Sequence, residues 1–575
     1  MVAELRAESL WEVPERRPEA EAGLQQELGI SPLLAAVLVR RGFDSPEAAA
    51  RFLNPELDGL HDPRLLPDYD KAESEILGAK ERGETIFVHG DYDVDGVSST
   101  ALFSRFLGRI GCKVLTHVPH RMREGYGIHA SAVDEAAKSG AKLFLTCDCG
   151  ISAIEQVERA HAAGMRVVVT DHHTVGRELP AAEAVVNPHR SDSSYPFSDL
   201  SGAGVAYKVA MGIAATLGLP MTGFHRAFLD LAALGTIADV MPLLDENRVI
   251  ARYGLEQIRE SKKPGIRALL RESRIEERAS LRTYDVSFGI GPRLNAAGRL
   301  DDAALSLQLL LAQDDAEAAP IARRIEELNT ARRTEQDRIV EEALVQVAET
   351  GQADSTVIVV WGERWHPGII GIVAGKLVDR FGRPSIVLSV DPESGKVRGS
   401  ARSIAGFHMA DAVRAHSELI EGGGHAMAAG FSGKAEELDD IAKSLASYGA
   451  ERLKPEDLVR RTVVDAEVEA READFAAAES LSALEPFGEA NPEPAVVVRG
   501  VPVEGVKQTR NPDHPQLLIR PDGIGFLRAP AFGLGRRLSG VEGGFVADLL
   551  IQPSIDEWQG QRRLRWAVRD LKTAD

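Results

Sequence analysis

Short apolar runs alternate with longer helix-compatible segments between residues 85 and 173. The runs Thr85–His89, Lys142–Cys147 and Arg166–Thr170 are too short for helices and rich in β-branched residues, which predicts buried strands. The segments between them end on glycines, as helices often do: 98–111, 129–140 and 152–164. This alternation predicts an α/β fold with a parallel sheet covered on both faces, in which ligands bind beyond the carboxyl ends of the strands.

Carboxylates and imidazoles follow each of these strands. The octapeptide His-Gly-Asp-Tyr-Asp-Val-Asp-Gly (89–96) begins at the end of the first strand, Asp148 follows the second, and Asp171-His172-His173 follows the third. Oxygen ligands with one or two imidazoles suit Mn²⁺ or Mg²⁺ better than metals that prefer thiolates, although Zn²⁺ stays an alternative. The loops therefore predict a site for two divalent metal ions. Such ions, about 3.5–4 Å apart, can clamp both oxygens of an in-line phosphoryl displacement.

The positions of these residues predict how the ligands divide between the ions. A tight turn can direct alternate side chains of the octapeptide to different ions, and a lone carboxylate at a strand tip is placed to bridge them. We expect six ligands: His89 and Asp93 on one ion, Asp95 and His172 on the other, Asp148 between them, and Asp239 at the end of the helical segment 224–239.

Each of these features also has a simpler interpretation. An isolated Asp-x-Asp is usually a solvated turn, a His-His pair usually lies on a surface loop, and Asp148 could cap the helix that starts near Ser152. Cys147-x-Cys149 could suggest a soft metal site, but no second cysteine pair exists, which favours buried thiols. The metal interpretation is favoured because all the polar groups fall on consecutive strand ends of one sheet.

The octapeptide, the lone Asp148 and Asp-His-His resemble the motifs of the DHH phosphoesterase superfamily. Further segments narrow the resemblance to the RecJ family of single-strand-specific 5′ to 3′ exonucleases: 201–208, 236–243, 291–300, 365–375 and 422–431. The resemblance covers nearly the whole chain. It implies a metal-dependent exonuclease, with Mn²⁺ as the expected metal and Mg²⁺ as the alternative, which degrades single-stranded DNA from its 5′ end to mononucleotides in DNA repair and recombination.

Pattern and resemblance together predict five segments. They are a helical N-terminal lead-in (1–67), a parallel-sheet DHH catalytic domain (68–313), a long linker helix (314–349), a smaller α/β domain similar to DHHA1 (350–455) and an OB-type β-barrel (456–575). The linker helix is indicated by a stretch rich in Ala, Glu and Arg without glycine, which only Pro320 interrupts. The central motif of the lead-in is the segment 27–42, which is expected to be amphipathic.

The charge of the chain limits how it can bind nucleic acid. A net charge of −20 argues against a protein that coats nucleic acid indiscriminately. Residues 501–575 are the least acidic stretch, with 11 Lys and Arg against nine Asp and Glu. No run of 18 apolar residues exists, the N-terminus lacks the apolar core of a signal peptide, and three cysteines fit a reducing compartment. We therefore expect a cytoplasmic protein without a membrane contact.

Short strand-like runs separated by turns predict the C-terminal barrel. The run Arg562–Trp566 alternates basic and apolar residues, as a strand with one basic face would. A five-stranded OB-type barrel is a common binder of single strands. The alternative is a barrel that only packs on its neighbours, with Trp558 and Trp566 in its core.

The smaller α/β domain has residues suited to binding phosphate. Ser400 and Arg402 can share one side of a strand, and the segment Gly422 to His425, including Gly423 and Gly424, could bring backbone amides close to an anion, as glycine-rich turns at helix starts do. A glycine run is more often a flexible turn, so the family resemblance carries this assignment. Arg299 is a further candidate for binding terminal phosphates, and Asn295 is a candidate for contacting DNA.

Other residues near the strand ends are assigned roles around the metals. His173, next to the ligand His172, is expected to neutralise or protonate the phosphoryl group, and Asp91 to orient His89. Arg121 is a further candidate for binding terminal phosphates. Tyr126 could stack on a base, although a loop tyrosine that covers the core is an alternative.

Two other functions stay open from the sequence. One is a phosphodiesterase or phosphatase of small nucleotides from the same superfamily, which needs no barrel. The other is a catalytically silent scaffold bound to DNA, which the intact ligand set argues against. Single-stranded DNA is the expected partner of a monomer. The family resemblance implies two further partners, a single-strand-binding protein and a recombination helicase.

Overall fold

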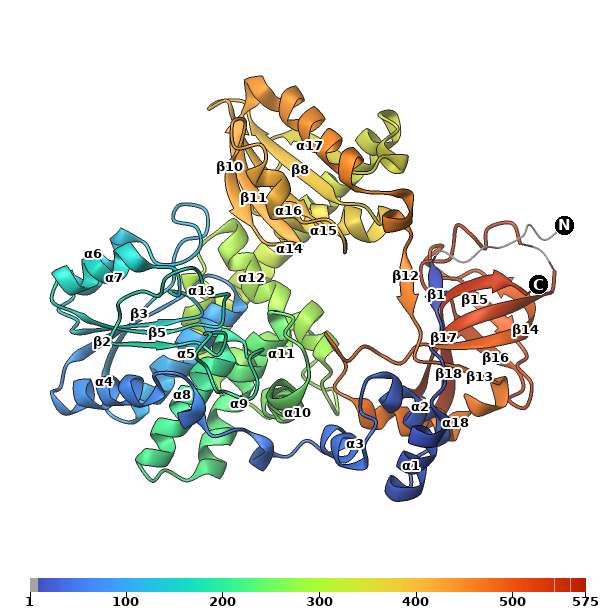
Figure 1. Ribbon diagram of the computed structural model, residues 1–575, viewed down its shortest axis with the longest axis horizontal. Coiled ribbons are helices and arrows are strands. Elements are labelled where there is room, and N and C mark those ends of the chain that lie inside the picture. Colours follow the sequence, from blue (N-terminus) through green and yellow to red (C-terminus); the bar gives the residue numbers. More distant parts are fainter. Residues whose placement is uncertain (1–8, 542, 559, 575) are drawn as a thin grey trace. The chain divides into compact units, whose positions relative to one another are not determined.

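The computed structural model describes residues 9–541, 543–558 and 560–574, apart from the side chain of Trp558 (Figure 1). The sequence-based prediction that the N-terminus is no signal peptide concerns residues that lie partly outside this description. The chain forms two compact units. The larger unit holds Glu56–Leu453 with Gly488–Ala490, and the smaller one joins Met1–Pro55 to Lys454–Phe487 and Asn491–Asp575.

A five-stranded parallel sheet organises the first half of the larger unit. Its strand order is β3-β2-β4-β5-β6, and every neighbouring pair is parallel. The strands are β2 (Thr85–Gly90), β3 (Lys113–His117), β4 (Leu143–Cys147), β5 (Arg166–Thr170) and β6 (Ala184–Val186). The helices that flank it are α4 (Tyr69–Glu81), α5 (Val94–Arg109), α6 (Ala130–Lys138) and α7 (Ile154–Ala162). The predicted alternation of strands and helices is therefore confirmed.

Both faces of this sheet are buried, as the continuous apolar strands predict. Ile86 and Val88 of β2 belong to one hydrophobic core, which includes residues of α4 and α5. Phe87 between them belongs to a second core with residues of α6 and α7. Figure 1 shows α6 and α7 on one side of the sheet and α4 on the other.

Helices follow the sheet and cover it further. They are α8 (Gly202–Thr216), α9 (Met221–Ala238), α10 (Asp245–Arg259), α11 (Pro264–Glu272), a π-helical turn (Asp285–Ile290), α12 (Gly291–Leu300) and α13 (Ala304–Leu311). The long α14 (Asp315–Glu349) then runs without a break, with Pro320 in its second turn. Pro320 has no amide hydrogen to donate to the carbonyl of Ala316, yet the helix continues past it. The predicted linker helix is confirmed.

A second, mixed sheet follows α14. Its order is β10-β11-β9-β8-β7, in which only β7 and β8 are parallel. The strands are β7 (Ile358–Glu363), β8 (Ser385–Asp391), β9 (Lys396–Arg402), β10 (Glu421–Gly424) and β11 (Ala428–Lys434), with helices α15 (Ile370–Phe381), α16 (Met409–Arg414) and α17 (Leu438–Arg452).

One local expectation in this sheet is wrong. The glycine run does not start a helix: Gly422, Gly423 and Gly424 form the edge strand β10, which pairs with β11. A side chain at Gly422 would lie 2.2 Å from the carbonyl oxygen of Gly430, so the glycines allow the two strands to approach closely. Packing within the sheet accounts for Gly422 and Gly424, whereas a side chain at Gly423 would meet nothing within 4 Å.

The smaller unit contains an antiparallel, barrel-like sheet of order β16-β15-β14-β17-β18, and β13 pairs with β14. A bridge between Ala531 and Val568 links the segment after β16 to β18 and curls the sheet. Its strands are β13 (Ala466–Val468), β14 (Val496–Lys507), β15 (Gln516–Ile519), β16 (Leu527–Pro530), β17 (Phe545–Trp558) and β18 (Gln561–Thr573), and α18 (Phe475–Leu481) lies between β13 and β14 in sequence. Trp566 is fully buried, and its indole donates to the carbonyl of Ala473.

The N-terminal segment is part of this smaller unit. Its elements are β1 (Leu10–Glu12), α1 (Pro18–Leu28), α2 (Pro32–Arg40) and α3 (Pro46–Leu53), and β1 pairs in parallel with β12 (Arg461–Val463). Every residue of α2 from Leu33 to Val39 is buried, so this helix is enclosed rather than amphipathic. The guanidinium of Arg41 donates to both carboxylate oxygens of Asp465, at 2.9 and 3.1 Å.

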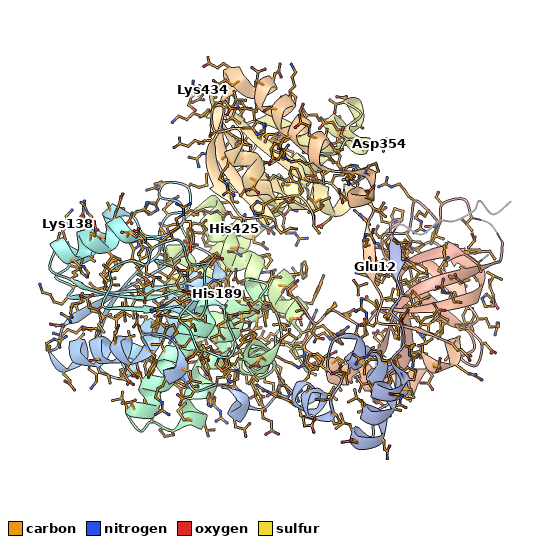
Figure 2. The ribbon with its side chains drawn as sticks, viewed as in Figure 1. Glu12, Lys138, His189, Asp354, His425 and Lys434 are labelled. Carbon is orange, nitrogen blue, oxygen red and sulfur yellow. The ribbon has the colours of Figure 1, made fainter. Side chains whose placement is uncertain are left out.

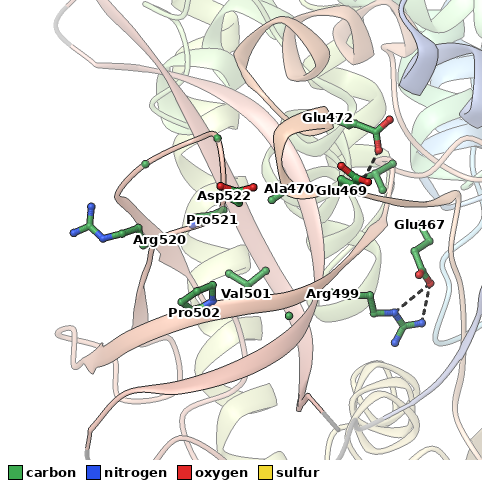
Figure 3. A pocket seen from close by; sticks show the side chains of 14 residues that line it. Glu467, Glu469, Ala470, Glu472, Arg499, Val501, Pro502, Arg520, Pro521 and Asp522 are labelled. Atoms are coloured by element: carbon green, nitrogen blue, oxygen red, sulfur yellow. Dashed lines mark hydrogen bonds and ion pairs between the residues drawn. The ribbon is translucent and has the colours of Figure 1, made fainter.

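The smaller unit also contains a hollow of about 850 Å³ between β13 and the turn that follows β15 (Figure 3). Four carboxylates line it: Glu467, Glu469, Glu472 and Asp522. Two arginines also line it, but both are already paired, Arg499 with Glu467 and Asp548 and Arg520 with Glu504. An acidic wall repels phosphodiesters, so we do not expect DNA to bind in this hollow. In the described part of the chain, no helix is long and apolar enough to cross a membrane.

Candidate metal centre and phosphate site

The register of the parallel sheet brings the predicted ligands to one edge. Gly90 of β2 lies beside Cys147 of β4, which lies beside Thr170 of β5, so the three strands end together. The loops that follow contain the octapeptide turn, Asp148 and Asp171–His173. Strand ends that lie level are the reason why residues about 80 positions apart in sequence meet here.

His172 lies among three carboxylates, of which Asp95 and Asp148 are buried and Asp239 is half-buried. Its Nε2 atom is 3.1 Å from Oδ1 of Asp148, 3.8 Å from Oδ2 of Asp95 and 3.7 Å from Oδ2 of Asp239. Two sets of side chains have ligand atoms within 4.8 Å of one another, namely Asp148 with His172 and His173, and Asp95 with His172 and Asp239. Four of the six predicted ligands are thus brought together, and His172 belongs to both sets.

The other two predicted ligands have different contacts. His89 is fully buried at the end of β2, where its Nδ1 is 3.1 Å from Nδ1 of His117 and its Nε2 is 3.3 Å from the carbonyl of Gly127. Asp93 caps α5, since its carboxylate accepts from the amide of Gly96 at 3.1 Å. Their role as ligands stays a prediction.

Asp91 is buried beside this turn. The backbone amides of Tyr92 and Gly127 bond to its carboxylate, which leaves Oδ1 without a hydrogen-bond partner. Among the described residues, no hydrogen bond joins Asp91 to His89. The proposed orienting role of Asp91 stays a prediction, and the unpartnered oxygen makes the residue a candidate for a further ligand.

Crowding of like charges perturbs the pKa values in this cluster. Burial and the charge of Asp93 raise the pKa of Asp95 to about 7, and burial with Asp95 and Asp93 raises the pKa of Asp239 to about 8. Burial and Asp95 also raise the pKa of Asp148 well above its usual range. Burial lowers the pKa of His172 to about 3, so its imidazole is neutral, which is the form that binds a metal.

These features fit a divalent cation. Oδ1 of Asp148 accepts no hydrogen bond although it is buried, and a buried carboxylate oxygen without a donor is costly. Glycines let the carboxylates sit against helix backbones: a side chain at Gly202 would lie 2.5 Å from Cβ of Asp148, and one at Gly235 would lie 2.2 Å from Oδ1 of Asp95. A bound cation would supply the charge that these buried oxygens lack.

The start of α8 fixes the carboxylate of Asp95. The amides of Gly202 and Ala203 donate to its two oxygens, at 2.6 and 2.8 Å. Ser201 caps the helix by accepting from Gly204, and its hydroxyl lies 3.0 Å from that of Thr236 in α9. The motifs at 201–208 and 236–243 therefore act together, since one orients Asp95 and the other contains Asp239.

His173 differs from His172 because it has an anionic partner. Its Nδ1 is 2.8 Å from Oδ1 of Asp171 and 3.0 Å from the hydroxyl of Tyr126. Tyr126 as a residue is 46% exposed. Burial lowers the pKa of His173, but the bond and charge of Asp171 outweigh burial and raise it to about 9. His173 is therefore protonated at neutral pH. Sequence reasoning assigned no role to Asp171, although it belongs to the motif.

Three arginines gather beside this centre without a carboxylate partner. Arg299 of α12 donates to the carbonyl of Gly368 at 2.8 Å, and the guanidinium of Arg121 lies 4.7 Å from the ring centre of Tyr92. Burial and the charges of Arg121, Arg332 and Arg402 lower the pKa of Arg299 to about 9. No ion pair between these three predicted arginines and a carboxylate exists in the described part of the chain. Uncompensated guanidiniums of this kind fit a phosphate ligand.

Ser400 and Arg402 lie on one face of β9, as predicted. A side chain at Gly371 in α15 would lie 2.8 Å from Oγ of Ser400 and 3.5 Å from the guanidinium of Arg402, so this glycine leaves space over both. Arg332 of α14 is a further arginine whose charge acts on Arg299, and the sequence analysis assigned it no role. It is 9% exposed and donates to the side chains of Asn329 and Gln336.

The remaining predicted contacts are more peripheral. Asn295 lies one turn before Arg299 on α12, so the two share a helix face. Gly423 and Gly424 belong to β10, and His425 is exposed in the turn that follows (Figure 2). DNA contacts for these residues stay predictions.

Comparison with known proteins agrees with this geometry. Residues 85–236 match the DHH family, N-terminal domain, residues 354–451 match the DHHA1 domain, and residues 464–570 match the RecJ OB domain. Single-stranded-DNA-specific exonuclease RecJ of Bacillus subtilis (strain 168) is 35% identical over 573 residues, which are 99% of this chain and 72% of the relative. RecJ of Escherichia coli (strain K12) is 33% identical over 97% of this chain and 98% of its own length.

The chain belongs to the RecJ family of DHH proteins. RecJ from Thermus thermophilus, solved in complex with Mn²⁺, has a TM-score of 0.84 and 29% identity, covering 98% of this chain and 80% of that one. The same RecJ in complex with Mg²⁺ has a TM-score of 0.78 and 28% identity, covering 98% of this chain and 79% of that one. The predicted family and the predicted order of DHH, DHHA1 and OB domains are confirmed. The exact domain limits stay predictions.

Proposed function

We propose that this protein is a metal-dependent exonuclease that degrades single-stranded DNA from the 5′ end and releases mononucleotides. Its RecJ relatives are named single-stranded-DNA-specific exonucleases. The observation that carries the proposal is the pairing of a carboxylate and imidazole cluster with arginines that have no carboxylate partner among the described residues. The first suits metal ions and the second suits a phosphate.

The ligand atoms support two divalent ions, with Mn²⁺ as the expected metal. His89, Asp93, Asp95, Asp148, His172 and Asp239 would hold them, and RecJ of Thermus thermophilus binds Mn²⁺ and Mg²⁺ in its crystal structures. Bound ions of this type activate water and neutralise charge on a phosphoryl group.

The protein's own residues would orient and neutralise the substrate. His173, held as an imidazolium by Asp171, can neutralise a phosphoryl oxygen or donate a proton to a leaving oxygen. Arg299 and Arg402 can bind a terminal phosphate, which would place the first phosphodiester at the metal centre. This arrangement would make the enzyme start at the phosphate-bearing end.

A polymer is a better substrate for this chain than a small nucleotide. The OB domain matched at 464–570 is an added module that hydrolysis of a dinucleotide does not require. The buried ligand set likewise argues against a catalytically silent scaffold. A monomeric state, a cytoplasmic location and contacts with a single-strand-binding protein and a recombination helicase stay predictions from the family resemblance.

The direct test uses strands labelled at either end. The protein is incubated with Mn²⁺ and with single- or double-stranded DNA labelled at the 5′ or the 3′ terminus, and product lengths are measured over time. We expect labelled mononucleotide at once from 5′-labelled single strands, gradual shortening of 3′-labelled ones, and no cleavage with a chelator. Immediate release of labelled mononucleotide from 3′-labelled strands would contradict the proposed 5′ to 3′ direction. A protein that hydrolyses dinucleotides but not these strands would contradict single-stranded DNA as the substrate.

A further inference from the structure

Val240, which follows the proposed ligand Asp239, has an unfavourable backbone conformation. Helix α9 ends in a Schellman motif, with the amide of Met241 donating to Thr236 and that of Val240 to Ile237, at 3.2 and 3.3 Å. Val240 takes the left-handed position of this motif with φ 57°. Glycine is usual there because a Cβ atom clashes with the backbone, and a β-branched side chain is the least suited of all.

Packing against the protein does not offset this strain. Val240 is 61% exposed. In contrast, Oδ2 of the preceding residue, Asp239, lies 3.7 Å from Nε2 of His172. Six other non-glycine residues of the described chain have positive φ, and none of them is β-branched. An exposed β-branched residue in a conformation that costs folding energy thus directly follows a proposed ligand of a highly charged centre.

We propose that Val240 is a substrate-positioning residue whose methyl groups pack against the sugar and base of the nucleotide held at the metal centre. This inference rests on the proposed function. Strained residues persist where the strain serves a site, and a β-branched side chain has few rotamers, so its methyl groups have a fixed direction. The phosphates of a nucleotide have the cations and arginines as partners. Its sugar and base are the parts that an apolar surface can bind.

The chain offers a matched control in Arg274. Helix α11 ends in the same motif, with the amide of Ile275 donating to Leu270 and that of Arg274 to Arg271, and Arg274 is exposed with φ 57°. Replacing either residue by glycine relieves the same strain. Only Val240 follows a proposed ligand in sequence.

The experiment compares Val240→Gly and Arg274→Gly in the full-length protein. Both variants should raise the Tm by about 1–3 °C, because glycine relieves the left-handed backbone. Val240→Gly should also lower kcat/KM on single-stranded DNA roughly tenfold, mainly through KM, since it removes an apolar contact. Its affinity for Mn²⁺, measured by calorimetry, should not change. Arg274→Gly should keep the parental kcat, and Val240→Thr, which keeps the branched shape, should lose less than about threefold.

Several outcomes would decide against this role. A Val240→Gly protein with parental kcat/KM would show that the side chain does not meet substrate. Weakened Mn²⁺ binding in that variant would show that Val240 acts through Asp239 instead. A parent protein without activity on single strands would overturn the proposed function itself, which the same assay shows before any variant is compared.

Discussion

At the scale of single residues, Asp148 is placed for a ligand rather than for stability. Its backbone is left-handed, with φ 61°, and its buried Oδ1 has no hydrogen-bond donor. A helix cap, the simpler interpretation of this residue, would have its oxygen bonded to an amide. The geometry therefore favours a ligand over a helix cap. Asp148 belongs to one of the two ligand sets and His172 is the residue that they share, so the bridging role of Asp148 stays a prediction.

Replacing Asp148 by Asn should abolish cleavage and leave the fold intact. The variant loses an anionic ligand, so activity should fall by more than about a hundredfold. The Tm without metal should not decrease, because one of several crowded carboxylates is removed, while Mn²⁺ should no longer raise it. Asp134→Asn, at a half-buried residue of α6 whose carboxylate pairs with Arg159, is the control for the loss of one carboxylate outside the centre. Activity within tenfold of the parent would remove Asp148 from the centre.

Arg402 can be tested against Arg398, which lies on the same strand β9 and is exposed. Arg402→Ala should reduce the preference for 5′-phosphorylated over 5′-hydroxyl strands by roughly tenfold, since a charge-assisted contact contributes about 1.5–3 kcal/mol. Arg398→Ala should leave that preference unchanged. Competition between the two strand types measures it. An equal effect of both substitutions would indicate general electrostatics instead of a phosphate site.

At the scale of secondary-structure elements, the start of α8 controls the metal centre without supplying a ligand. Gly202→Ala would place Cβ 2.5 Å from Asp148, so the carboxylate must shift. We expect Mn²⁺ affinity and activity to fall at least tenfold, while a circular dichroism spectrum stays parental. The matched control is Gly223→Ala in α9, where nothing lies within 4 Å of the added carbon. Unchanged Mn²⁺ affinity in the Gly202 variant would show that the carboxylate need not be held there.

A buried ion pair connects α8 to α10. Lys208 and Glu246 are both fully buried, with Nζ 2.7 Å from Oε1, and Glu246 also accepts from the hydroxyl of Tyr195 and the amide of His61. Glu246→Gln should lower the free energy of unfolding in urea by about 3–5 kcal/mol, because it leaves an unpaired buried ammonium.

Two controls define that effect. Removal of the exposed pair Arg267–Asp315 should cost less than about 1 kcal/mol. The double variant Lys208→Met with Glu246→Gln should be more stable than the sum of the single effects implies. Strict additivity would show that the two charges do not depend on each other.

The elements near the site could be predicted because local pattern determines them. Short β-branched runs gave the strands β2, β4 and β5, and the alanine-rich stretch gave α14, within a few residues of the structure. The strand β10 could not be predicted from its glycine run, because the close approach of two strands depends on a partner elsewhere in the sequence. Asp171 and Arg332 were missed for the same reason: the first acts through His173, and the second depends on how α14 packs.

At the scale of the whole molecule, the pairing of the two ends of the chain was invisible to local pattern. The strand β1 pairs with β12 about 450 residues away, and Arg41 pairs with Asp465. The predicted basic strand in this unit is also less basic than its sequence suggests. Asp556 and Glu557 of β17 lie opposite Arg563 and Arg562 of β18, and Arg562 is paired with Glu479.

Because the N-terminal segment pairs with residues of the C-terminal barrel unit, the two have to be removed together. Deleting 464–575 alone would expose the buried helix α2, so we expect that protein to aggregate. A chain of residues 56–453 keeps the larger unit except its short segment Gly488–Ala490, in which Glu489 accepts from the amide of Leu243. We expect it to be soluble, to bind Mn²⁺ and to cleave very short oligonucleotides within a few-fold of the parental rate.

On long strands the same protein should lose affinity and depend less on salt. Each phosphate contact that the smaller unit makes releases counter-ions, so its removal should flatten the slope of log affinity against log salt by about one unit per lost contact. Fluorescence anisotropy of a long and a short oligonucleotide, titrated at several salt concentrations, measures both quantities. If the 56–453 protein binds long strands with the parental affinity and slope, the barrel only packs, and the DNA contacts lie entirely in the larger unit.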